Sequence, residues 1–214
     1  MSWSERAWLQ VDDVVAEIRE HPFVRALHDG SLPGEVFDRY LVDDAHYLVG
    51  YARSLALVAS RLPDAADVGR WAGFAQGAVL AERELHADYL GSRGLGIDTA
   101  PPTPTGAAYT GHLLAHAAAS PVEVAVAATL PCFRVYLEVG RSMLPVDAAH
   151  PYAGWIATYA DEAFAASVQQ AEETADRLAD RAPHLVSAMH AAYREATRLE
   201  WRFWDAAWRG EVAD

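Results

Sequence analysis

The sequence predicts an all-α protein. Of its 214 residues, 52% are hydrophobic and 22% are charged, a balance typical of a globular chain that buries a sizeable core. Alanine is abundant and β-branched runs are scarce, and both features favour helix over sheet. No Ser/Gly-rich linker divides the chain, and no segment alternates in the manner of a strand. We therefore expect residues 1–214 to form a single domain, a helical bundle of seven to eight helices.

Proline and glycine mark where each helix begins and ends. The predicted helices cover residues 4–20, 21–27, 33–62, 64–93, 106–119, 121–143, 151–180 and 183–209. Pro22 stops the first helix and Gly30 ends the short second one. Pro33 suits the first turn of the third. In that helix, aromatic and apolar side chains recur at helical spacing from Phe37 to Tyr51, so they share one face.

The second half of the chain is divided by the same signals. Pro63 breaks the chain before the long fourth helix, and Gly94 follows its end. Three prolines within residues 97–105 predict a loop. Residues 120–123 (Ser-Pro-Val-Glu) have the pattern of a capping box with proline at the first helical position. Pro183 opens the last helix.

The charge balance argues against several classes of partner. The formal net charge is −13, and the 17 Lys and Arg residues are dispersed rather than clustered. Such a surface repels a phosphate backbone and an anionic membrane surface, so we expect no nucleic-acid or membrane partner. No apolar stretch reaches the roughly 18 residues of a membrane span. The N-terminus lacks a signal-peptide profile and there is one cysteine, which predicts a cytoplasmic protein.

That cysteine, Cys132, is the most informative residue. A lone thiol makes no intramolecular disulfide and is too few for a thiolate metal site. It is either a small hydrophobe in a helix contact or a nucleophile. Tyr136 lies one helical turn beyond it, where its hydroxyl could bond a nearby ligand.

Two carboxylates lie among aromatic residues. Asp44 and Tyr47 are three residues apart and project from one side of a helix. Asp44 is either a surface residue or a carboxylate that accepts hydrogen bonds from a ligand's amino group. Glu200 shares a face with Phe203 and Trp204. It is either solvated or a general acid whose pKa is raised by apolar surroundings.

Three further features have a simpler structural reading. Tyr109 and Tyr159 are single tyrosines on other helices, and each alone suits a core or interface position. Glu82 and His86, four residues apart, suit a structural hydrogen bond better than a metal site.

Taken in order, several segments resemble the TenA/thiaminase II family, whose members have the heme-oxygenase-like helical fold. The likeness covers nearly the whole chain. It rests on residues 21–23 (His-Pro-Phe), 29–33 (Asp-Gly-Ser-Leu-Pro), 37–48, 109–110, 130–132 with Tyr136, Glu138 and Gly140, 155–160 and 200–208.

The resemblance implies a hydrolase of thiamin salvage. Family members convert 4-amino-5-aminomethyl-2-methylpyrimidine to the 5-hydroxymethyl pyrimidine, and many also cleave thiamin, less efficiently. By this likeness Cys132 is the nucleophile, Asp44 holds the pyrimidine and Glu200 is the acid/base. The substrate-binding residues it implies are Tyr47, Tyr109, Tyr136, Tyr159 and Phe203. It also implies a homotetramer with no metal or organic cofactor.

Three residues depart from the family pattern. Asp43 stands where glutamine is common, His46 where an aromatic residue is frequent, and Arg134 where an apolar one is frequent. These differences bear on the preferred substrate more than on the fold.

Two alternative functions stay open. One is a metal-dependent oxidase or oxygenase on the same scaffold; its candidate ligands are Glu82, His86, Asp161, Glu162 and His190. The other is a non-catalytic pyrimidine-binding protein.

Overall fold

The computed structural model of the protein describes residues 1–85, 89–91, 94–98 and 100–212. These residues contain ten α-helices, one short 3-10 helix and no strand, so the predicted all-α class is confirmed. The helices are α1 (Trp3–Leu9), α2 (Asp12–Arg19), α3 (Pro22–Asp29), α4 (Gly34–Arg61), α5 (Ala65–Leu85), α6 (Pro104–Ala119), α7 (Val122–Ser142), α8 (Ala153–Ala160), α9 (Glu162–Arg181), η3 (Pro183–Leu185) and α10 (Val186–Arg209).

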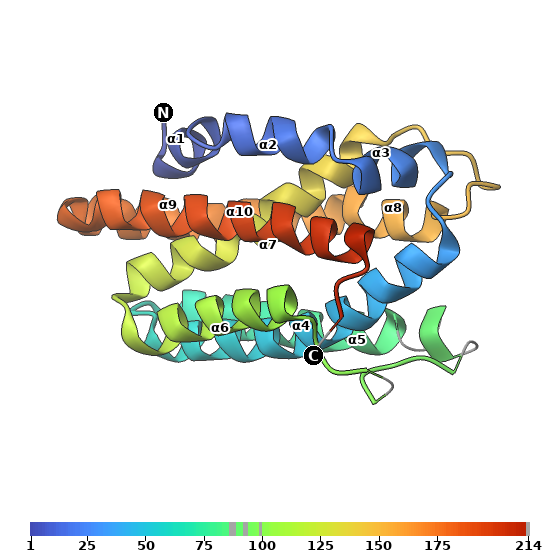
Figure 1. Cartoon of the computed structure of the whole chain (residues 1–214). Helices are drawn as coiled ribbons and strands as arrows, with labels where there is room; N and C mark the ends of the chain where they lie inside the picture. The colour runs from blue at the N-terminus through green and yellow to red at the C-terminus, as the bar shows by residue number, and fades with distance from the viewer. Residues whose placement is uncertain (86–88, 92–93, 99, 213–214) are drawn as a thin grey trace.

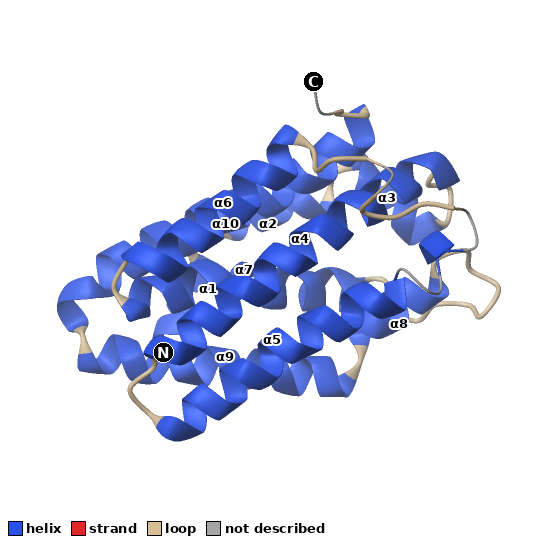
Figure 2. Ribbon diagram, turned by 90° about the horizontal axis from the view of Figure 1, so that it is seen from below, coloured by secondary structure: helices blue, strands red, loops and turns tan. Residues whose placement is uncertain are grey.

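The helices form three tiers (Figure 1). Helices α1–α3 lie along one side, most of α4 lies with α5 and α6 on the other, and α9 and α10 run between them. Seen at right angles, most helices run roughly parallel or antiparallel to one another (Figure 2). Every one of the ten helices contributes side chains to one buried hydrophobic cluster. Helix α7 is buried along most of its length, because α4, α6, α8, α9 and α10 all pack against it.

The prediction of a single helix over residues 4–20 is wrong. The backbone leaves the helical ladder at Gln10 and Val11 and re-enters it as α2. The break is stabilised from α10, where Arg194 donates to the Gln10 carbonyl oxygen at 2.6 Å and to the Asp13 carboxylate. Local periodicity could not predict this break, because Arg194 is distant in sequence.

The predicted helix over residues 151–180 is also two helices. Asp161 adopts an extended conformation, and its carboxylate accepts a hydrogen bond from the Ala163 amide at 2.8 Å, which caps α9. The last segment begins with the 3-10 turn η3 before α10. The divisions of the predicted helices 4–20 and 151–180 explain why the described residues contain ten α-helices rather than the expected seven to eight.

The starts of two other helices also differ from prediction. Helix α6 begins at Pro104, two residues early, because the Thr103 hydroxyl caps it. The expected capping box before α7 is not formed. The Ser120 hydroxyl instead contacts Nδ1 of His116 at 2.8 Å, and α7 begins at Val122 with no side-chain cap.

Two glycines let helices approach closely around α7 and α4. A Cβ atom on Gly140 would lie 2.8 Å from the backbone of Tyr159, so α8 lies directly against α7. A Cβ on Gly50 would lie 2.1 Å from the Thr110 side chain on α6. Both approaches depend on the missing side chain.

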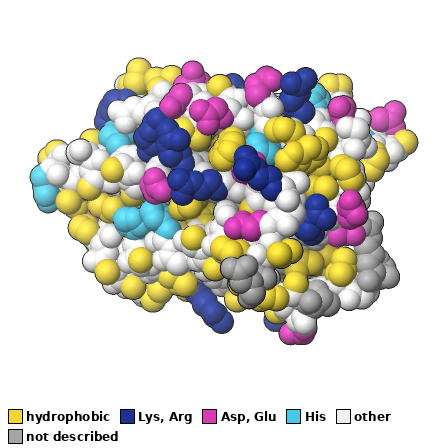
Figure 3. Space-filling view, viewed as in Figure 1, with side chains coloured by type: hydrophobic (Ala, Val, Ile, Leu, Met, Phe, Trp, Pro, Cys, Tyr) yellow, Lys and Arg dark blue, Asp and Glu magenta, His cyan; other side chains and the backbone are white. Residues whose placement is uncertain are grey.

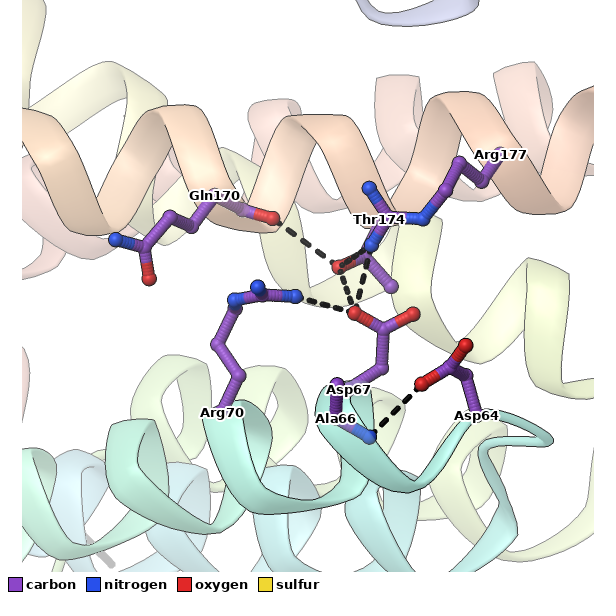
Figure 4. A network of polar contacts seen from close by, with 7 residues as sticks. All are labelled: Asp64, Ala66, Asp67, Arg70, Gln170, Thr174 and Arg177. Carbon is purple, nitrogen blue, oxygen red and sulfur yellow. Dashed lines mark hydrogen bonds and ion pairs between the residues drawn. The ribbon is translucent and has the colours of Figure 1, made fainter.

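A buried aspartate joins α5 to α9 (Figure 4). Asp67 is 6% exposed, and its Oδ1 accepts hydrogen bonds from Arg177 at 2.6 Å, from Thr174 at 3.2 Å and from Arg70. Its neighbour Asp64 caps the start of α5 through the Ala66 amide. These charge-assisted bonds connect two helices that have few other contacts.

The surface agrees with the expected lack of a basic patch on the face shown in Figure 3. The basic side chains there, which are all arginine in this sequence, have carboxylates among them. The arginines of α10 have acidic partners: Arg194 pairs with Asp13, Arg202 with Glu195 at 4.0 Å and Arg209 with Asp205 at 2.9 Å. Among the helices of the described chain, none is both long and apolar enough to cross a membrane.

Candidate active site

A cavity of about 240 Å³ leads from the surface to Cys132. Its outer lining includes the exposed residues Gly73, Gly77 and Thr158, and its inner lining includes the buried Tyr51. The full lining is Leu48, Tyr51, Gly73, Phe74, Gly77, Ala78, Ala81, Cys132, Phe133, Thr158, Tyr159, Phe164 and Ser167. Five helices, α4, α5, α7, α8 and α9, therefore contribute to its wall.

Helix α7 places Cys132 in the wall of this cavity. Pro131 lies inside the helix and has no amide hydrogen to donate, so the ladder is interrupted next to the thiol. The Tyr51 hydroxyl donates to the nearby Thr129 carbonyl oxygen at 2.9 Å. The thiol is partly buried, and its access to the cavity distinguishes it from a cysteine packed in solid core.

The surroundings keep the thiol protonated in the unliganded protein. Desolvation is the largest cause that raises the pKa of Cys132 well above its usual range, and negative charge on Glu200 and Asp44 raises it further. The hydroxyls of Tyr47 and Tyr51 oppose part of the rise. Both predicted carboxyl groups therefore lie near enough to interact electrostatically with the predicted nucleophile.

Glu200 is buried on α10, 1% exposed. The Tyr109 hydroxyl of α6 donates to its Oε1 at 2.6 Å. Burial raises the pKa of Glu200 to about 8, the Tyr109 hydrogen bond opposes this rise, and the charge of Asp44 adds to it. At neutral pH this group is mostly a carboxylic acid, which can donate a proton.

The neighbouring carboxyls Asp43 and Asp44 lie in different environments. Asp43 accepts hydrogen bonds from the Thr103 amide at 2.8 Å and the Thr103 hydroxyl at 2.6 Å, so it anchors the segment before α6. Asp44 is 2% exposed, and its Oδ2 has no hydrogen-bond partner among the described residues. Burial raises the pKa of Asp44 to about 8, and the charge of Asp43 adds to the rise.

The predicted aromatic residues pack into one layer. The Tyr47 ring lies 4.8 Å from Tyr109 and 5.6 Å from Phe203, and the Tyr136 ring lies 4.7 Å from Tyr159. The Tyr47 hydroxyl lies near the thiol and the Tyr109 hydroxyl, yet makes no hydrogen bond of normal geometry within the described chain.

The structure brings the eight predicted site residues together, but not all of them line the cavity. Cys132 and Tyr159 do. The other six are buried behind this surface: Asp44, Tyr47, Tyr109, Tyr136, Glu200 and Phe203.

Sequence reasoning missed Tyr51 as a site residue. Its ring stacks on that of Tyr47, with centroids 5.5 Å apart and an angle of 15°, and it lines the cavity. The available signal was its position four residues after Tyr47, one helical turn along the same face. Phe74, Phe133 and Phe164, which also line the cavity, have no such signal in the sequence.

The other two residues that depart from the family pattern, Arg134 and His46, contact other parts of the protein. Arg134 lies over the Trp8 ring, 4.8 Å from its centroid, and 3.7 Å from Glu172, so its charge is engaged by α1 and α9. His46 contacts the Ala100 carbonyl oxygen at 2.8 Å.

The candidate metal ligands do not form a cluster in the part of the chain that the structure describes. Asp161 caps α9, Glu162 pairs with Arg141, and His190 stacks on Trp3 at 5.3 Å. Glu82, through its side chain, and His86 lie outside what is described. Within the described residues, no three His, Cys, Asp or Glu side chains are grouped so that they could hold a metal ion.

Comparison with known protein sequences identifies the family of this chain. A sequence model of the TENA/THI-4/PQQC family matches residues 8–210. The chain belongs to this family. A relative named aminopyrimidine aminohydrolase, from Bacillus subtilis (strain 168), is 33% identical over 196 residues, which are 89% of this chain and 83% of that protein. A thiamine biosynthesis multifunctional protein ThiED from Corynebacterium efficiens is 35% identical over 97% of this chain, which spans 28% of that protein's length.

Solved structures confirm the predicted fold. A TenA homologue from P. horikoshii OT3 superposes with a TM-score of 0.89 at 25% identity, covering 98% of this chain and all of that one. A domain with a heme oxygenase-like fold from Shewanella denitrificans OS217 superposes with a TM-score of 0.72 at 17% identity, covering 96% and 92% of the two chains.

Proposed function

We propose that the protein is an aminopyrimidine aminohydrolase of thiamin salvage. In this reaction 4-amino-5-aminomethyl-2-methylpyrimidine and water give the 5-hydroxymethyl pyrimidine and ammonia. The observation that carries the proposal is the grouping of a cavity-lining thiol, Cys132, with two buried carboxyls of raised pKa, Asp44 and Glu200. The family and the aminopyrimidine aminohydrolase relative support the same reaction.

Asp44 suits recognition of an aminopyrimidine. A neutral carboxyl offers one acceptor and one donor side by side. An aminopyrimidine edge offers the complementary pair, an amino group and a ring nitrogen. The Oδ2 atom of Asp44, buried without a partner in the described chain, costs free energy that such a ligand would recover.

Cys132 and Glu200 would divide the chemistry into two steps. The sulfur bonds to a ring carbon while a ring nitrogen takes the proton of Glu200, and the proton of the thiol passes to the exocyclic amine, which becomes an ammonium group. The ring nitrogen then returns its proton to Glu200, and its electron pair breaks the exocyclic carbon–nitrogen bond, so that the amine leaves as ammonia. Water adds to the exocyclic methylene while the ring nitrogen again takes the proton of Glu200. The carbon–sulfur bond then breaks, the ring nitrogen returns its proton and becomes aromatic again, and the sulfur recovers the proton that the water lost. Covalent addition replaces one difficult substitution with two easier ones.

The aromatic layer would orient the ring. Tyr47, Tyr109, Tyr136, Tyr159 and Phe203 present flat surfaces near the thiol, which favours a stacked ring at fixed distance from the sulfur. Because most of these side chains lie behind the cavity surface, a ring bonded to Asp44 displaces part of this layer. No metal or organic cofactor takes part in these steps.

The test is ammonia release from the aminomethylpyrimidine. We expect turnover by the wild type and a loss of at least about 10³-fold with Cys132→Ser, because an alcohol is a far weaker nucleophile here. Equal turnover by the two proteins would remove the nucleophile assignment. No turnover by either, with tight binding retained, would favour the non-catalytic pyrimidine-binding protein.

Thiamin cleavage, assembly as a homotetramer and a cytoplasmic location stay predictions. Thiazole release and light scattering of the purified protein would test the first two.

A further inference from the structure

We propose that Gly73 and Gly77 of α5 form the port through which the leaving group of the substrate extends from Cys132 toward solvent. The absence of side chains at these two positions would then set how large that group can be. This inference rests on the proposed function, because the leaving group is defined by that reaction.

Both glycines belong to the wall of the thiol's cavity. They are exposed, they line the same cavity as Cys132, and they are four residues apart, so they lie on one face of α5. The deeper lining residues Tyr51 and Phe133 are buried. The path from solvent to sulfur therefore passes beside these two glycines.

Packing within the chain does not require glycine at either position. A Cβ atom at Gly73 or Gly77 would meet no atom within 4 Å, and neither residue has a positive φ. Gly50 and Gly140 differ, since a Cβ there would collide with a neighbouring helix. Glycine in the middle of a helix is less favourable than alanine. Neither packing nor backbone conformation therefore explains why positions 73 and 77 are glycine.

Two hydroxyl residues of the cavity lining, Thr158 and Ser167, bond within their own helices. The Thr158 hydroxyl donates to the Gly154 carbonyl oxygen at 3.0 Å, and the Ser167 hydroxyl donates to the Ala163 carbonyl oxygen at 3.1 Å. The cavity lining includes no charged residue.

Three phenylalanines, Phe74, Phe133 and Phe164, contribute to the wall of the same cavity. The Phe133 ring lies 5.2 Å from Phe74 and 6.4 Å from Phe164. The geometry fits a flat, weakly polar leaving group better than a charged, strongly hydrated one, because the wall offers ring surfaces and no ionic partner.

Gly69 provides a matched control. It lies one turn before Gly73 on the same helix, and a Cβ there would also meet no atom within 4 Å. It does not line the cavity. Leucine at positions 69, 73 and 77 therefore makes the same chemical change, but only two of the changes narrow the port.

The first experiment measures access to the thiol without requiring any turnover. Cys132 is the only cysteine, so intact mass reports its modification directly. Wild type, Gly69→Leu, Gly73→Leu and Gly77→Leu are treated with iodoacetamide and with fluorescein maleimide. We expect Gly73→Leu and Gly77→Leu to slow the bulky reagent by at least about tenfold while the small reagent changes much less. Gly69→Leu should match the wild type with both reagents.

Unchanged rates with the bulky reagent in folded Gly73→Leu and Gly77→Leu would overturn the port. A change of molecular mass by light scattering in all three variants would also overturn it, because the glycines would then serve a contact between chains. Circular dichroism checks folding, and Gly77→Ala repeats the comparison with a smaller change should leucine not be tolerated.

The second experiment concerns the reaction. With the aminomethylpyrimidine, which loses ammonia, we expect Gly77→Leu to keep most of the wild-type kcat/KM. With thiamin, which loses a thiazole, we expect kcat/KM to fall at least about tenfold. An equal fall for both substrates would contradict the port. Absence of ammonia release by the wild type would contradict the proposed function, and the thiol-access rates would still decide the port.

Discussion

Two buried acidic regions of the molecule differ in how their oxygens are bonded. At the junction of α5 and α9, Asp67 is 6% exposed and accepts hydrogen bonds from Arg70, Thr174 and Arg177. Behind Cys132, Asp44 is 2% exposed, with an oxygen that no described residue bonds. Glu200 there has the Tyr109 hydroxyl and no cation paired with it in the described chain.

The difference separates an acid that joins two helices from the acids of the candidate site. A buried carboxylate that accepts hydrogen bonds from guanidinium groups connects two helices. A buried carboxyl without a cation binds its proton more tightly and keeps unused hydrogen-bonding capacity. Perturbed carboxyls of this kind cluster at functional sites. Asp43 is intermediate, since Thr103 donates two hydrogen bonds to it although burial still raises its pKa.

The largest expected effect is on catalysis at Glu200. Glu200→Gln keeps the size of the side chain and an acceptor for Tyr109 but cannot deliver the same proton. We expect kcat for ammonia release to fall by about 10²–10⁴-fold. Glu195→Gln, on the same helix and about half exposed, should leave kcat unchanged. Full activity of Glu200→Gln would remove the distinction between the two acidic regions.

The next effect is on the pH dependence of stability. Folding raises the pKa of Asp44 from 3.8 to about 8 and that of Glu200 from 4.5 to about 8. At pH values between the unfolded-state and native-state pKa of each carboxyl, the native state holds a proton that the unfolded state has lost. The free energy of unfolding therefore falls as pH rises. Each carboxyl contributes a slope of up to about 1.4 kcal/mol per pH unit.

Urea unfolding at pH 5, 6, 7 and 8 measures this slope. Asp44→Asn removes one titrating group and should flatten the decline, and Asp44→Asn combined with Glu200→Gln should flatten it further. A wild-type stability that stays level or increases over this interval would contradict the assignment of raised pKa values.

At the other acidic region, removal of the carboxylate should cost stability without costing chemistry. Asp67→Ala leaves the guanidinium groups of Arg70 and Arg177 without this acceptor, while the Thr174 hydroxyl keeps the Gln170 carbonyl oxygen. We expect a loss of about 2 kcal/mol, which lowers Tm by about 4–8 °C. Asp64→Ala, which removes only the cap on α5, should cost about 1 kcal/mol. For both variants kcat at 25 °C should stay close to that of the wild type; a collapse of kcat in Asp67→Ala at full stability would reverse the comparison.

The smallest expected effects come from two glycines. Gly69→Ala adds a methyl group where nothing lies within 4 Å, so it should stabilise α5 by up to about 1 kcal/mol and raise Tm by about 2–4 °C. Gly140→Ala makes the same change 2.8 Å from the Tyr159 backbone, so it should lower Tm instead. Thermal unfolding by circular dichroism measures both, and shifts of the same sign would contradict this packing.

Much of the helical pattern could be read from local signals. Gly30 ends α3 in the left-handed conformation, as expected, whereas Pro33 is the N-cap of α4 and lies just before the first turn in which it was predicted. The prediction failed at Gln10, where a distant arginine supplies the partner for the broken ladder. It failed at Asp161 for a different reason: the capping signal was present, but helical spacing continued across it.

The candidate site was predicted less directly. The resemblance to a family indicated Cys132, Asp44 and Glu200, and the structure places them near one another. Spacing alone left each with a structural alternative. Tyr51 was missed although its spacing from Tyr47 indicated it. The glycines of the proposed port were missed because only a cavity made by five helices relates them to the thiol.

Composition and the positions of proline and glycine by themselves determined the helical class, the single thiol and the acidic surface. These properties depend only on which residues are present and in what order. Only the tertiary structure decided which of the buried acids is satisfied and which is left with a free oxygen. Two adjacent carboxyls of identical chemistry, Asp43 and Asp44, differ because ionisation and hydrogen bonding depend on neighbours brought in from distant helices.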